Sequence, residues 1–100
     1  MTSPSTSCVS VHSAETQAHL DTAEKHLSQC FHAQIATGAS TATALASSQR
    51  DRAYVLAMDN ASNHSGLVTS DMKSFFMQKQ EERISNKVVQ DHETRTAAAK

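Results

Sequence analysis

Histidine is the residue type whose spacing first suggests chemistry in this chain. His12, His19 and His26 recur every seven residues, which places them along one face of a helix. Cys30 follows His26 by four residues, the spacing at which two side chains of one helix can bind the same metal ion. Successive histidines of the repeat would lie about 10 Å apart, too far for one ion to bridge. We therefore assign no metal site, and keep His26 and Cys30 as weak candidates.

The histidine repeat has two further interpretations. A seven-residue spacing is that of a coiled coil, and polar residues commonly flank the apolar contact of such helices. The histidines would then be ordinary residues at the edge of a helix interface. Charging several of them below about pH 6 would add mutual repulsion, so a pH-sensitive interface is the other alternative.

A row of basic residues is the second pattern that suggests a ligand. Lys79, Arg83 and Lys87 follow one another at steps of four, but acidic residues lie close by in the sequence. Nine Lys and Arg residues face ten Asp and Glu residues in the whole chain, and no aromatic residue is interleaved with the row. Binding to nucleic acid or to an anionic membrane needs a surplus of positive charge. We therefore expect a solvated helix face and neither kind of partner.

Sequence motifs of catalysis are absent. The chain has no serine elbow, no His-Glu-x-x-His helix and no cysteine nucleophile in a recognisable signature. Its two glycines are too few for a phosphate-binding loop. The sequence thus predicts no enzyme, no cofactor and no small-molecule substrate, and no motif is specific enough to assign a family.

The composition limits the fold that could position these residues. One hundred residues allow a single domain. Leu, Ile, Val and Phe together supply only 16 of them, so the hydrophobic core should be thin. Burial that the chain cannot complete alone would then be completed by a copy of itself or by another protein.

Helix is the only regular structure that the pattern predicts. Residues 1–12 are rich in Ser and Thr and are expected to form a flexible tail, after which Ser13 is placed to cap a helix. Gly38 either ends this first helix, with a restart at Ser40, or lies inside a helix that continues past it with small residues along its interface, and the sequence leaves both alternatives open. We predict an all-α fold, an antiparallel helical hairpin or a small three-helix bundle, in one domain over 13–98. Its expected helices cover about 13–37, 40–59 and 69–97, with a turn at 59–68.

Apolar residues recur at helical spacing and form the predicted contact surface. Steps of three and four residues place them on one face of each helix. Packed against the chain itself, a second copy or a larger partner, they would form the interface. The candidates are Leu20, Leu27, Phe31, Ile35, Leu45, Leu56, Met72, Phe76, Ile84 and Val88.

These patterns favour a non-enzymatic helical interaction module, a subunit or adaptor of a larger assembly. The alternative is a small helical protein exported by a bacterial specialised secretion system, because the charge-free N-terminus resembles the unstructured export signals of type III substrates. Cys8 and Cys30 are expected to be free thiols, as in a reducing compartment. No apolar run approaches the ~20 residues of a membrane span, and no signal peptide is evident. We expect a cytoplasmic protein, or one exported without a classical signal.

Overall fold

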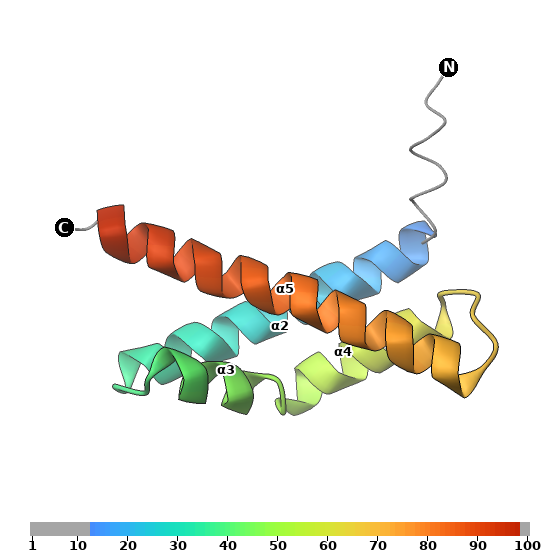
Figure 1. Cartoon of the computed structure of the whole chain (residues 1–100), viewed down its shortest axis with the longest axis horizontal. Helices are drawn as coiled ribbons and strands as arrows, with labels where there is room; N and C mark the ends of the chain where they lie inside the picture. The colour runs from blue at the N-terminus through green and yellow to red at the C-terminus, as the bar shows by residue number, and fades with distance from the viewer. Residues whose placement is uncertain (1–12, 99–100) are drawn as a thin grey trace, which may run out of the picture.

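The computed structural model describes residues 13–98, and the fold of this part is all-α (Figure 1). It confirms the predicted class, with four helices where two or three were expected and no strand between 13 and 98. The helices are α2 (Ala14–Ala36), α3 (Thr41–Ser48), α4 (Arg52–Asn63) and α5 (Ser70–Ala98). The tail predicted for 1–12 lies outside the described residues.

The helices form two layers. In Figure 1, α3 and α4 together run back along α2, so that these three helices form a hairpin whose returning arm is broken in two. The long helix α5 lies across this layer and contacts all three of its helices. The molecule measures 44 × 32 × 19 Å along its principal axes. The two layers of helices are stacked along the shortest of these axes (Figure 1).

The turn after α2 settles the role of Gly38. Its φ of +97° is a left-handed conformation that favours glycine, and it ends the helix directly after the C-cap Thr37. The Ala39 backbone N–H donates to the carbonyl of Gln34 at 3.1 Å, which closes the last turn. Ser40 then caps α3 by accepting a hydrogen bond from the Thr43 backbone N–H at 3.2 Å. Of the two alternatives, the helix ends at Gly38 and a new one begins.

The prediction of a single helix over 40–59 is wrong, because the helix is interrupted between α3 and α4. The Asp51 carboxylate accepts a hydrogen bond from the Tyr54 backbone N–H at 3.2 Å and starts a new helix. The turn predicted at 59–68 also begins too early, since α4 continues to Asn63. Ala61 and Ser62 are buried there, and this burial outweighs the turn preference of the neighbouring Asp and Asn residues.

The last helix begins close to its predicted start. The Thr69 hydroxyl accepts a hydrogen bond from the Met72 backbone N–H at 3.1 Å and so caps the first turn of the helix. The helix then runs to Ala98, but every described residue after His92 is exposed. The end of α5 therefore projects beyond the helices on which it lies.

The core lies where α5 crosses the broken hairpin. Its buried apolar members are Leu20, Ala23, Leu27, Phe31, Ala44, Tyr54, Ala57, Met58, Ala61, Phe76, Ile84 and Val88. Tyr54 is the largest of the fully buried side chains, and its hydroxyl donates to Glu81 of α5 at 3.2 Å. Burial, and secondarily the nearby Glu81 carboxylate, raise the pKa of Tyr54. The tyrosine thus stays a neutral donor that joins α4 to α5.

No helix within 13–98 combines the length and the apolar character that crossing a membrane requires.

Candidate functional site

Both predicted metal candidates lie on α2. His26 and Cys30 are both half-buried, and His12 lies outside the described residues. Nowhere in the described chain do three His, Cys, Asp or Glu side chains gather closely enough to hold a metal ion. The pair on α2 therefore has no third ligand in this part of the chain.

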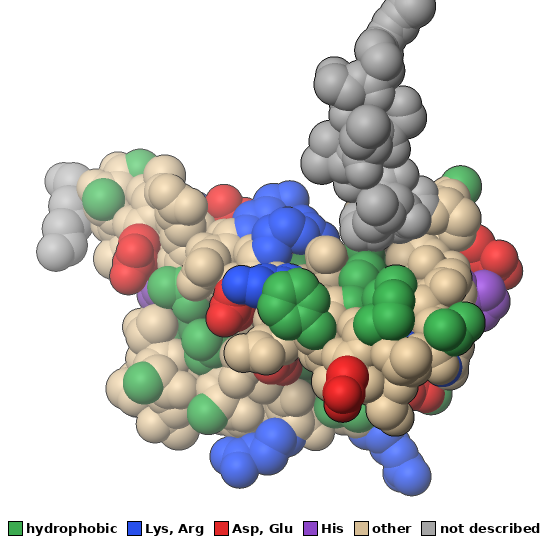
Figure 2. Space-filling view, turned by 45° about the vertical axis from the view of Figure 1, so that its right-hand side comes forward, with side chains coloured by type: hydrophobic (Ala, Val, Ile, Leu, Met, Phe, Trp, Pro, Cys, Tyr) green, Lys and Arg blue, Asp and Glu red, His purple; other side chains and the backbone are tan. Residues whose placement is uncertain are grey.

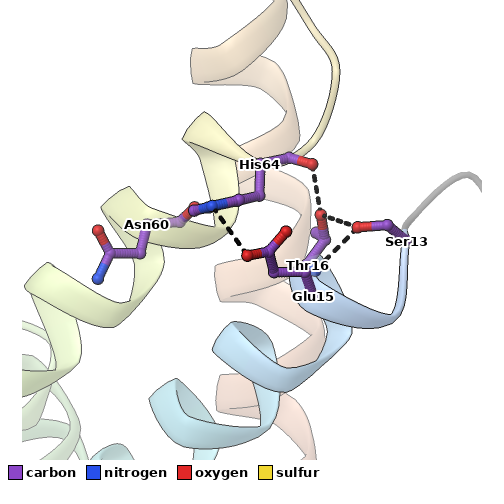
Figure 3. A network of polar contacts seen from close by, with 5 residues as sticks. All are labelled: Ser13, Glu15, Thr16, Asn60 and His64. Carbon is purple, nitrogen blue, oxygen red and sulfur yellow. Dashed lines mark hydrogen bonds and ion pairs between the residues drawn. The ribbon is translucent and has the colours of Figure 1, made fainter.

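His19 instead packs beside His64, which lies in the turn predicted at 59–68. The rings of His19 and His64 lie 4.8 Å apart between centroids, tilted by 32°. The Nε2 atom of His64 is 3.3 Å from a carboxylate oxygen of Glu15, and its Nδ1 atom is 2.9 Å from the carbonyl oxygen of Asn60 (Figure 3). Both ring nitrogens therefore have an acceptor beside them.

Hydroxyl groups complete this network without forming a catalytic pair. Thr16 donates from its hydroxyl to the carbonyl of His64 at 2.6 Å, and its backbone N–H donates to the Ser13 hydroxyl at 3.1 Å (Figure 3). An activated nucleophile needs a hydrogen bond between its hydroxyl and a base. Here the imidazole lies beside Glu15 and Asn60, whereas the Thr16 hydroxyl bonds to the His64 carbonyl and the Ser13 hydroxyl. The network joins the start of α2 to the end of α4.

A second aromatic cluster lies near the far end of α2. The Phe31 ring packs edge-on against His32 and His92, at centroid distances of 5.5 and 5.4 Å. Burial lowers the pKa of His32, and the positive charges of Arg95 and His92 lower it further, against a smaller opposite effect of Asp91. The cluster therefore favours a neutral imidazole between α2 and α5.

Stability should fall on acidification through this cluster. Because the pKa of His32 lies below its usual value of 6.5, the unfolded chain binds the proton more readily. The contribution of His32 is present above pH 6.5 and is lost as the pH falls from there through its folded-state pKa. We expect the urea midpoint to fall between pH 7.5 and pH 5.5, and to fall less in His32→Gln. An equal decline in both proteins would contradict this assignment.

The basic row of α5 is partly neutralised. Lys87 forms an ion pair with Glu24 of α2 at 3.0 Å, and this hydrogen bond raises the pKa of Lys87. Arg83 donates to the Gln80 side chain at 3.0 Å. Lys79 lies 3.9 Å from Glu82. The row thus contributes to packing between α2 and α5 at one end, and the absence of a nucleic-acid partner stays a prediction.

Burial divides the predicted interface residues. Leu20, Leu27 and Ile84 are completely buried, as is Phe31, and Phe76 and Val88 are nearly so. Ile35 and Leu45 are partly buried against the core. These eight pack against the chain itself, one of the three arrangements that the pattern allowed. Leu56 and Met72 remain exposed.

Met72 belongs to an apolar groove at the start of α5, which we call the α5 groove. Leu67, Met72, Phe75 and Phe76 line it, Asp71 and Lys79 lie at its ends, and its volume is about 490 Å³. Phe75 is 62% exposed and Met72 is 45% exposed. Figure 2 shows hydrophobic side chains side by side on this face, with charged side chains at their edge. Phe75 is not among the interface residues that the sequence pattern predicted.

A second exposed apolar area lies on α4 and differs in its surroundings. Val55 and Leu56 lie there with Met77, but Arg50 and Arg52 border it. Exposed aliphatic side chains between arginines are common on protein surfaces. This area supplies a matched comparison for the α5 groove, because Leu56 is about as exposed as Phe75.

Comparison with known proteins adds no relative. No protein-family model, no curated protein and no solved structure matches this chain significantly. Only the residues and their geometry therefore bear on its function.

Proposed function

We propose that this chain is a non-enzymatic helical interaction module that binds a helical segment of a partner protein in the α5 groove. The observation that carries the proposal is the exposure of Phe75 and Met72 side by side, next to the buried Phe76. Exposing adjacent large apolar side chains to water is unfavourable for a lone chain. Contiguous apolar surface with a polar rim is typical of a protein-binding site.

The chemistry of the groove fits a helix as its ligand. An aromatic side chain in the middle of a contact commonly contributes much of its binding energy, and Phe75 occupies that place. Asp71 and Lys79 at the two ends would orient a ligand by their opposite charges. An amphipathic helix presents apolar residues at steps of three and four, which matches the spacing of Met72, Phe75 and Phe76.

An enzymatic role receives less support from the described residues than a binding role. The polar network around His64 joins α2 to α4. Within it, no hydroxyl group is hydrogen-bonded to the His64 imidazole. A binding groove serves a subunit or adaptor in the cytoplasm, and it serves equally a protein exported without a classical signal. The proposal is therefore about the mode of action and not the compartment.

Selection of helical peptides tests the proposal. A library of amphipathic peptides of about 15 residues, some four helical turns, would be selected on the full chain. Affinities would then be measured by fluorescence anisotropy at low chain concentration. We expect the selection to yield peptides with an apolar face. Phe75→Asp should weaken the affinity for these peptides about 30-fold or more, as for a central aromatic anchor.

Leu56→Asp is the matched control, because it places the same charge at an equally exposed apolar position outside the groove. Its peptide affinity should equal that of the unmodified chain. The proposal fails if no helical peptide is selected, or if peptides bind the Phe75→Asp and Leu56→Asp chains equally well.

A further inference from the structure

The exposed face of α5 carries a charge pattern with a centre of symmetry. Asp71, Phe75 and Lys79 follow one another at steps of four, and all three are exposed. Residues at this spacing lie in a row along one face of a helix. The acidic residue and the basic residue are thus equally far from the phenylalanine, one on each side.

Such a row is complementary to its own antiparallel copy. When two identical helices pack antiparallel about a two-fold axis at Phe75, residues equally far before and after Phe75 face each other. Asp71 of each copy then meets Lys79 of the other, so that two ion pairs flank a central pair of phenylalanine rings. A parallel arrangement would place like charges opposite each other.

The charges at both ends are available for this contact. Among residues 13–98, Asp71 forms no ion pair. Lys79 lies 3.9 Å from Glu82, at the limit of an ion pair, and its ammonium group lies over the Phe75 ring at 5.5 Å from the centroid. The lysine side chain therefore already lies along the face that the second copy would cover.

We propose that the partner in the α5 groove is a second copy of this chain, packed antiparallel through α5 about Phe75. This inference rests on the proposed function, since it names the helix that the groove binds. The overlap of residues 70–80 is only about 16 Å long, so the interface is smaller than that of a stable dimer. The dimer should be weak and should dissociate on dilution.

Sedimentation equilibrium over a hundredfold range of concentration tests the dimer. The average mass of the unmodified chain should rise from that of the monomer toward twice that value. Phe75→Asp should stay monomeric over the same range, whereas Leu56→Asp should associate like the unmodified chain. A monomer at every concentration of the unmodified chain would overturn the inference.

Charge reversal tests the antiparallel geometry. Asp71→Lys makes both ends of the row positive, and Lys79→Asp makes both ends negative. The self-association constant of each variant alone should fall by about tenfold or more, because like charges face each other at both contacts. An equal mixture of the two should associate again, because opposite charges then face each other at both ends. Circular dichroism of each variant shows that its helices are intact.

The outcomes separate this inference from the proposed function. Self-association of either single variant at the level of the unmodified chain, or a mixture that stays monomeric, overturns the antiparallel pair. If the unmodified chain is monomeric but still binds helical peptides through Phe75, the proposed function stands and its partner is a different protein. Loss of both results rejects both proposals.

Discussion

Phe31→Ala should destabilise the fold by about 3–5 kcal/mol, the usual effect of removing a large aromatic side chain from a core. The Phe31 ring is completely buried and touches imidazoles on both α2 and α5. Its removal leaves a cavity at the crossing of these helices. Because small domains are stable by only about 5–15 kcal/mol, a large part of the free energy of unfolding should be lost. Urea unfolding followed by circular dichroism measures the change in midpoint.

Phe75→Ala is the control for this experiment. It removes the same ring from the same chain, but at a position that is largely exposed. Its effect on the free energy of unfolding of the monomer should be within about 0.5 kcal/mol, as for most surface substitutions. Equal destabilisation by the two substitutions would show that the core does not lie at the crossing of α5 with α2.

Ala23→Leu should destabilise the fold by about 1–3 kcal/mol through overpacking. Ala23 is completely buried on α2, between Leu20 and Leu27 of the same stripe, and belongs to the core cluster. A leucine there needs space that protein interiors do not leave unfilled. The helix propensity of leucine is close to that of alanine, so the loss would come from packing. Thermal unfolding measures it as a lower melting temperature.

Ala18→Leu is the matched substitution on the solvent face of the same helix, where Ala18 is exposed. We expect its melting temperature to equal that of the unmodified chain. If Ala23→Leu were tolerated as well, the helices would not approach each other closely at this position.

The buried stripe of α2 shows what periodicity can predict. Leu20, Leu27 and Phe31 recur at steps of four or seven, and all of them are completely buried. The cap at Ser13 was predictable for a similar reason, since its hydroxyl accepts a backbone hydrogen bond from three residues further along. Both features depend on residues close in sequence. Local chemistry therefore determines them.

Two of the three missed features depend on burial or on contacts between distant residues. Asp51 is an N-cap, and its residue type was the only signal of the break between α3 and α4. The extension of α4 to Asn63 follows from burial of Ala61 and Ser62, which no local preference predicts. His64 was interpreted as a turn residue, yet its carbonyl binds Thr16, which lies 48 positions earlier. Sequence alone does not reveal which helix a turn will meet.

The candidate groove was only half predictable. The apolar row of α5 selected Met72 and Phe76, of which one is exposed and the other is buried. Phe75 and Phe76 are adjacent, so they lie about 100° apart around the helix and cannot both face the core. Which of them faces the solvent depends on the direction in which α5 crosses the other helices. That direction is a property of the tertiary packing.

The projecting end of α5 should differ from the rest of the helix in the rate at which its amide hydrogens exchange. Ile84, Ser85 and Val88 are buried at the crossing, so their amide hydrogens are released only when the core opens. The turns after His92 bury little, and their hydrogen bonds break and re-form at small cost in free energy. Hydrogen exchange would therefore divide this continuous helix into a slow segment at the crossing and a fast segment at its exposed end. Geometric continuity does not make α5 a single dynamic unit.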